Sequence, residues 1–185
     1  MIAAIIILVV TVVLVAGIYN SLVAKKNGVK TAFSTVDVLL KKRYDLIPNL
    51  VATVKSYMEH EKELLTKITE LRSKAMDAGD SKEERFNADN EVSKAVRGIM
   101  LAVENYPDLK ANQNFIQLQA TMTEVEEQIS AGRRAYNAAV LEYNNAVQMF
   151  PTNIFASMFN YTLEKFFEAD ETERQNVNVS ELFKG

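Results

Sequence analysis

The 185-residue chain has no cysteine, and proline, glycine and histidine are scarce, with 3, 6 and 1 copies respectively. The lack of cysteine excludes disulfide scaffolds, zinc sites built on thiolates and thiol nucleophiles, and it fits a reducing or an oxidising compartment equally well. Because proline and glycine punctuate turns and short strands, their scarcity favours long uninterrupted helices. The composition therefore predicts an all-α fold.

A surplus of positive charge is also missing. The chain carries 21 Lys and Arg residues against 24 Asp and Glu residues, a formal net charge of -3. Such a balance supplies no basic stripe of the kind that holds a phosphate backbone, so nucleic acid is not an expected partner. With 48% hydrophobic and 24% charged residues, the composition is ordinary for one compact domain plus an anchor.

The most distinctive feature that the sequence does have is an apolar N-terminal segment. Residues 2–18 contain no charge and only Thr11 as a polar side chain, and residues 22–24 extend the apolar run. As a helix, residues 2–24 would span about 35 Å, enough for a bilayer core of about 30 Å. A cleaved signal peptide would begin with a positively charged region, which is lacking here. The pattern predicts a transmembrane anchor at residues 1–24 of a single-pass cell-membrane protein.

Basic residues flank only one side of this anchor. Lys25, Lys26 and Lys30 follow it closely, and no basic side chain precedes it. The positive-inside rule then predicts that the N-terminus lies outside and the C-terminal domain in the cytoplasm. Lys25 and Lys26 are expected at the membrane surface, where each adds about 1 kcal/mol of attraction to anionic lipid headgroups.

Apolar residues spaced by threes and fours predict four helices in the rest of the chain. The expected helices cover residues 29–43, 50–76, 81–104 and 112–149. A kink or a turn is expected at residues 44–49, and the turn is favoured, because Pro48 lacks the amide that a helix interior needs. Ser81 and Glu84 have the spacing of a capping box at the start of the third helix.

The short breaks between these helices make neighbours antiparallel. The pattern therefore predicts an antiparallel up-and-down four-helix bundle with long helices over residues 25–160. A short packed helix is expected after Pro151, and residues 161–185 are expected to form a partly extended C-terminal tail.

Three stretches of the chain resemble one family. They read YNSLVAKKNGVKTAFSTVDVLLKKRYDLIPNLVATVKSYMEHE from Tyr19, ENYPDLKANQNFIQLQ from Glu104 and ISAGRRAYNAAVLEYNNAVQMFP from Ile129. Their order and content resemble the LemA family of bacterial membrane proteins, over nearly the whole chain. The resemblance implies a membrane-anchored antiparallel helical bundle with no established enzymatic activity. Family members implicated in organising bacterial organelle membranes further imply a role in assembly or scaffolding.

The sequence offers little catalytic chemistry. The one imidazole, His60, lies between two glutamates without the HExxH or Glu-x-x-His spacing of helical metal sites, and a solvated helix-face histidine is expected. No GxSxG motif or phosphate-binding glycine loop is present. We expect no enzymatic activity, no cofactor and no metal site.

A repeated Tyr-Asn pair is the strongest candidate binding feature. Tyr136-Asn137 and Tyr143-Asn144 are seven residues apart, so both pairs lie on the same face of the fourth helix. In one interpretation the tyrosines belong to the core and the asparagines form a polar layer that fixes helix register. In the other, the four side chains line a hydrogen-bonding groove for a peptide or a small ligand.

Two basic clusters complete the candidates, at residues 41–43 and at Arg133-Arg134. With the second helix folded back, residues 41–43 would lie about 30 Å beyond the bilayer surface, too far to contact lipid headgroups. Ordinary surface ion pairs are expected for both clusters.

These features favour a membrane-anchored, non-enzymatic scaffold or adaptor that binds protein partners. Self-association as a homo-oligomer is expected from the regular apolar repeat between Phe115 and Phe150, which is close to a strict heptad. The alternative is a membrane-tethered sensor that binds a small ligand or peptide in the groove at the Tyr-Asn pairs.

Overall fold

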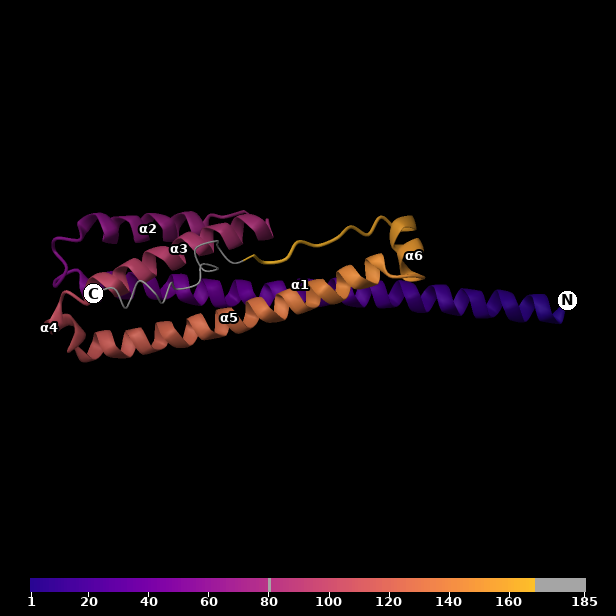
Figure 1. Cartoon of the computed structure of the whole chain (residues 1–185), viewed down its shortest axis with the longest axis horizontal. Helices are drawn as coiled ribbons and strands as arrows, with labels where there is room; N and C mark the ends of the chain where they lie inside the picture. The colour runs from indigo at the N-terminus through magenta and orange to yellow at the C-terminus, as the bar shows by residue number, and fades with distance from the viewer. Residues whose placement is uncertain (80, 169–185) are drawn as a thin grey trace, which may run out of the picture.

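The computed structural model describes residues 1–79 and 81–168, and over these residues the chain is all-helical, as predicted (Figure 1). The part of the predicted tail beyond residue 168 lies outside the described residues. The helices are α1 (Ile2–Val54), α2 (Lys62–Met76), α3 (Lys82–Val103), α4 (Pro107–Lys110), α5 (Gln113–Gln148) and α6 (Thr152–Met158).

Helix α1 joins the apolar N-terminal segment to the bundle without a break. Its N-terminal part projects beyond the other helices (Figure 1), and Leu22 is the first buried residue along it. The projecting part contains an apolar stretch long enough to cross a membrane, and none of that stretch is buried. The structure thus has one candidate membrane span among its described residues, near the N-terminus.

The turn expected at residues 44–49 is wrong, because α1 continues through Pro48 to Val54. Tyr44, Ile47 and Leu50 continue one buried face across the proline, while Pro48 itself is exposed. Burial of each such side chain contributes about 1.5–3 kcal/mol, so together they outweigh the roughly 3 kcal/mol that an internal proline costs.

The chain reverses instead at residues 55–61. Met58, which is fully buried, fixes this turn to the core. His60 lies in the turn and is exposed, so the expectation of a solvated histidine is confirmed, but its expected position on a helix is wrong.

The other helix ends follow the sequence signals. The Ser81 Oγ accepts a hydrogen bond from the Glu84 amide at the start of α3 (3.4 Å), as the capping pattern predicts. Pro107 begins the short helix α4, where its missing amide costs little. The side chain of Asn112 caps α5 by accepting from the amides of Asn114 and Phe115 (2.9 and 3.2 Å).

The predicted four-helix bundle is formed by helices that run alternately up and down, namely α1, α2, α3 and α5 (Figure 1). α5 packs along α1, and α2 packs on α3. After α5, the helix α6 lies across the bundle at its anchor end, and the chain then returns along the bundle as an extended segment (Figure 1).

Gly132 permits a close approach of α5 to α1. A Cβ atom at this position would lie 3.2 Å from the Val36 Cγ2 and 3.5 Å from the Leu39 Cδ1. Nothing lies within 4 Å of the corresponding position at Gly28 in α1. The two glycines are therefore a matched pair for testing how tightly the helices pack.

We predict that Gly132→Leu lowers the free energy of unfolding by about 1–3 kcal/mol, because overpacking forces the two helices apart. Gly28→Leu is the control and is expected to leave stability unchanged or slightly higher, since leucine has the better helix propensity. Urea denaturation in detergent micelles measures both. Equal effects of the two substitutions would contradict a close helix contact at Gly132.

Candidate binding groove

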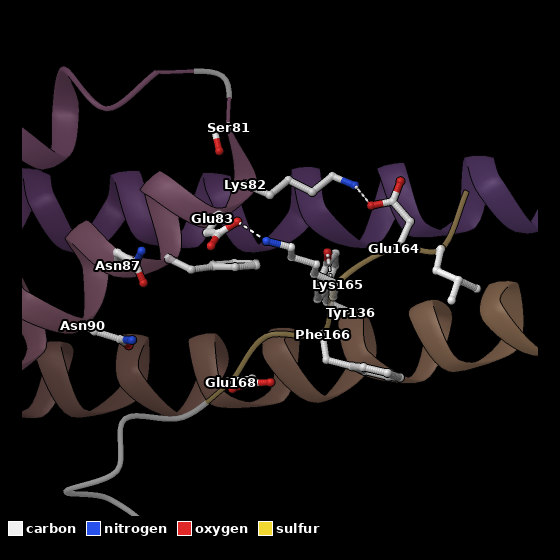
Figure 2. A pocket seen from close by; sticks show the side chains of 12 residues that line it. Ser81, Lys82, Glu83, Asn87, Asn90, Tyr136, Glu164, Lys165, Phe166 and Glu168 are labelled. Carbon is white, nitrogen blue, oxygen red and sulfur yellow. Dashed lines mark hydrogen bonds and ion pairs between the residues drawn. The ribbon is translucent and has the colours of Figure 1, made fainter. Parts of the chain in front are cut away.

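Residues 161–168, termed the docked segment, form neither helix nor strand. The segment lies between the start of α3 and the face of α5 that carries the repeated Tyr-Asn pairs (Figure 2). Backbone amides and carbonyls in such a partly buried position need hydrogen-bond partners. Side chains of α5 supply them.

Two asparagines bind the backbone of the docked segment in the same way. Asn144 donates through Nδ2 to the Glu164 carbonyl (2.9 Å) and accepts through Oδ1 from the Glu164 amide (2.9 Å). Asn137 makes the same pair of bonds with the carbonyl and amide of Phe167 (3.0 and 2.8 Å). Each side-chain amide thus pairs with one residue as a neighbouring β-strand would.

Two tyrosines add a second set of bonds. Tyr143 donates its hydroxyl to the Thr162 carbonyl (2.8 Å), and Tyr136 donates to the Lys165 carbonyl (3.0 Å). Both rings are buried. Burial and the nearby Glu164 carboxylate raise the pKa of Tyr136 to about 12, so this hydroxyl is a donor throughout the neutral range. Tyr136, Asn137, Tyr143 and Asn144 are termed the Tyr-Asn ladder.

The ladder has a register set by geometry. Its members repeat every seven residues of α5, about 10.5 Å of helix, and their targets repeat every three residues of the docked segment, about 10 Å of extended chain. The segment runs antiparallel to α5, since residues 162 and 164 meet the C-terminal pair and residues 165 and 167 the N-terminal pair. Because every ladder bond is made to backbone atoms, the ladder recognises an extended chain whatever its side chains.

Helix α3 contacts the side chains of the same segment. Lys82 pairs with Glu164, and Glu83 pairs with Lys165, each at 2.7 Å between nitrogen and oxygen (Figure 2). The hydrogen bond to Glu83 raises the pKa of Lys165. The two α3 side chains thus match an acidic residue followed by a basic one, and each pair is partly or largely exposed.

Phe167 completes the side-chain contacts. Its ring packs edge-to-face on Phe86 of α3 with 4.8 Å between centroids, and the Arg133 guanidinium lies 4.2 Å from the ring centroid. A cavity of about 770 Å³ lies beside the segment, lined by Ser81, by α3 residues from Lys82 to Asn90, by Tyr136 and by the docked segment itself. The groove therefore has backbone-directed contacts on α5 and side-chain contacts on α3.

The two interpretations of the Tyr-Asn pairs can be compared with these contacts. The tyrosine rings belong to the core, as the first interpretation expects. The asparagine amides bond to an extended peptide and not to another helix, as a groove would. The peptide in this groove is the chain's own.

Lys25 and Lys26 lie where α1 enters the bundle. The Lys25 ammonium is 3.4 Å from a Glu142 carboxylate oxygen, and the Lys26 ammonium lies 5.2 Å from the centroid of the Tyr161 ring. Both contacts are at the anchor end of the bundle. Contact of these lysines with lipid headgroups stays a prediction.

A buried charged cluster was missed by the sequence analysis. Asp89 of α3 is fully buried and forms ion pairs with Arg43 of α1 and Arg133 of α5, while the Tyr44 hydroxyl donates to it (3.3 Å). Arg43 also pairs with Glu126 at 2.5 Å. Burial lowers the pKa of Arg43, an effect that Glu126 partly offsets. The cluster ties three helices together.

The expectation of surface ion pairs for the two basic clusters is therefore wrong for Arg43 and Arg133. Arg43 is only 2% exposed. The sequence did hold a signal, because Asp89 lies three residues from both Phe86 and Val92, on the buried face of α3. A charge at a core position of a helix implies a charged partner at a core position of another.

Over its described residues, the chain is a helical bundle with one candidate membrane span near the N-terminus and an extended segment, residues 161–168, that packs along α5. Comparison with known proteins assigns it to a family. The sequence model of the LemA family matches residues 32–180, and the chain belongs to this family.

Individual relatives match over most of their length. Protein LemA of Metamycoplasma hominis is 28% identical over 163 residues, which cover 88% of this chain and 74% of the relative. Magnetosome protein MamQ 2 of Paramagnetospirillum magneticum is 20% identical, and magnetosome protein MamQ of Magnetospirillum gryphiswaldense is 18% identical. Each of these two matches covers 90% of this chain and 70% of the relative.

We predict that the double variant Asn137→Leu/Asn144→Leu releases the docked segment. Hydrogen exchange at the Glu164 and Phe167 amides should accelerate by about tenfold or more, because each lost bond contributes around 1 kcal/mol. NMR-detected exchange measures both amides. The control is Asn145→Leu, an exposed neighbour on the same helix. Unchanged protection in the double variant would show that the ladder does not hold the segment.

We also predict that Asp89→Ala lowers the free energy of unfolding by about 3–5 kcal/mol, because it leaves buried guanidinium groups without their carboxylate. Asp37→Ala is the control. It breaks the ion pair with Arg85, both of whose side chains are partly exposed, and should cost less than about 1 kcal/mol. Chemical denaturation distinguishes them, and a small loss for Asp89→Ala would contradict a structural role of the cluster.

Proposed function

We propose that this protein is a membrane-anchored, non-enzymatic adaptor that binds protein partners through extended peptide segments and self-associates by the same contact. The observation that carries the proposal is the Tyr-Asn ladder, which bonds the docked segment through backbone atoms alone. Surfaces that add an extended peptide through main-chain bonds are a recurring mode of protein recognition.

The contacts on α3 define which segments fit the groove. Lys82 and Glu83 favour an acidic residue followed by a basic one, and Phe86 with Arg133 favours an aromatic residue two positions further on. The chain's own residues in these places are Glu164, Lys165 and Phe167. A partner segment is therefore expected to read acidic, basic, any residue, aromatic.

A second copy of the chain meets these requirements without any change. Exchange of the docked segment between two copies would keep the contacts of the ladder and of α3, and it would rearrange Phe159 and Asn160 and break the hydrogen bond from the Tyr161 amide to the Ala156 carbonyl. Asn160 already has a left-handed backbone (φ 55°), a conformation that asparagine tolerates. Copies anchored in one bilayer would present their grooves at the same height and with the same orientation, which raises the effective concentration of the exchanging segment.

The membrane part of the proposal rests on the N-terminal helix. Residues 1–24 are proposed to span the cell membrane, with the N-terminus outside and the bundle in the cytoplasm. The exposed apolar stretch of α1 and the lysines at positions 25, 26 and 30 support this orientation.

The second candidate function is a sensor, and it is favoured by the same groove. Because the bound peptide belongs to the chain itself, an arriving peptide with the same pattern would compete with it. Displacement would release the docked segment and so report the presence of the peptide. Adaptor and sensor differ in which molecule supplies the replacing segment.

Carbodiimide crosslinking tests these functions, because it joins a carboxylate to an amine in direct contact. Copies labelled with ordinary and heavy nitrogen are mixed in vesicles, and the link between Lys82 and Glu164 is analysed by mass spectrometry. We expect links of mixed isotope content, which arise only if segments are exchanged between copies. The link between Lys110 and Glu104 is the internal control, since it joins neighbouring parts of one chain and should stay unmixed.

An added peptide with the sequence of residues 160–168 separates the two candidates. Linking of this peptide to Lys82 without exchange between copies would favour the sensor over the self-associating adaptor. The Asn137→Leu/Asn144→Leu variant should capture less peptide than wild type. Purely unmixed links together with no capture of the peptide would mean a permanently closed internal contact and would overturn both functions.

A further inference from the structure

A cluster of exposed apolar side chains surrounds α6. Met149, Phe150, Ile154, Met158 and Phe159 are 61%, 80%, 54%, 65% and 44% exposed, and they are termed the α6 patch. Large apolar side chains gathered at one place on a surface mark contact with another apolar surface, either of a protein or of a lipid bilayer.

The patch has an ordered face. Ile154 and Met158 are spaced by four residues, so they form a row on one side of α6, and Phe150 is exposed just before the helix begins. Ala156, on the opposite side, is buried against the rest of the protein. The Thr152 hydroxyl fixes the start of α6 by donating to the carbonyls of Ala146 (2.5 Å) and Met149 (2.8 Å). The row is therefore held outward.

The position of α6 along α1 indicates that the contacted surface is the lipid bilayer. The Phe159 ring contacts the Tyr19 ring edge-to-face, with 5.3 Å between centroids. Tyr19 lies about 26 Å along the helix from Ile2, close to the thickness of a bilayer core. α6 thus lies beside α1 about five residues before the proposed span ends at residue 24 (Figure 1).

The neighbours of the patch suit a lipid-water boundary. Tyr19 and Tyr161 are of the residue type that concentrates at this depth, and phenylalanine occurs on the apolar face of helices that lie in the interface. The ammonium groups of Lys25 and Lys26 lie at the same end of the bundle, where they would meet lipid phosphates. Full burial of a side chain such as Ile or Phe contributes about 1.5–3 kcal/mol, so the row gains from entering the interface.

We propose that the α6 patch is a second membrane-contact site, with Phe150, Ile154 and Met158 inserted into the lipid headgroup region beside the anchor. This inference rests on the proposed membrane span of α1. The ligand is the lipid surface itself, bound by apolar insertion and by the adjacent lysines. With two contacts, the bundle can neither rotate about α1 nor lift away from the bilayer without withdrawing the patch.

The chain has no tryptophan, so a single introduced tryptophan reports the depth of one position without background. The test variants are Ile154→Trp and Met158→Trp in the α6 patch. Leu101→Trp is the water control, because Leu101 is 73% exposed near the end of α3 that lies far from the anchor (Figure 1). Leu8→Trp is the control for the span. Each full-length variant is reconstituted in phosphatidylcholine vesicles whose acyl chains carry bromine at a shallow or a deep position, which quenches nearby tryptophan.

We expect Ile154→Trp and Met158→Trp to lose emission, more with the shallow bromine than with the deep one, and Leu101→Trp to keep it. Leu8→Trp should be quenched strongly by either. Patch tryptophans no more quenched than Leu101→Trp, with Leu8→Trp quenched, would overturn the second contact and leave the anchor standing. Absence of quenching at Leu8→Trp would instead overturn the proposed span, and the inference with it.

Discussion

The packing of α5 along α1 is the contact on which the Tyr-Asn ladder depends. α1 supplies a continuous buried face, and α5 approaches it closely where Gly132 meets Val36 and Leu39. Four residues further along α5 the Tyr-Asn ladder begins, so the same contact that fixes α5 also fixes the direction in which the ladder faces. A backbone-directed groove needs this rigidity, because its bonds tolerate little displacement between helix and peptide.

The buried cluster around Asp89 sets the other wall of the groove. Its ion pairs join α3 to α1 and α5, and the N-terminal part of the same helix carries Lys82, Glu83 and Phe86, which contact the docked segment. Hydrophobic packing alone would allow α3 to slide along its neighbours with little change in buried area. A buried carboxylate between two guanidinium groups prevents such sliding, because displacement would leave buried charges without partners. We therefore interpret the cluster as the element that fixes the register of α3.

Local signals made much of this fold predictable, and contacts between distant residues made the rest unpredictable. The cap at Ser81 depends on neighbours in sequence, and the structure confirms it. The Asn112 cap and the helix start at Pro107 are equally local features. The turn predicted at Pro48 was wrong because the free-energy cost of an internal proline can be read from the local sequence. The burial of neighbouring side chains that outweighs this cost depends on contacts with other helices. The Tyr-Asn repeat was recognised as a candidate site, but its occupant was not, because the docked segment lies twenty to thirty residues away and has no periodic pattern of its own.

The unbroken course of α1 has a mechanical consequence. In the proposed orientation, the 30 residues from Lys25 to Val54 form a lever of about 45 Å above the bilayer, without a joint at the membrane surface. A change in bilayer thickness that tilts the span by about 20° would carry the far tip about 15 Å sideways. The state of the lipid layer would in this way be transmitted as a lateral movement of the outer end of the protein, and Pro48, the residue expected to interrupt the helix, lies within the arm that transmits it.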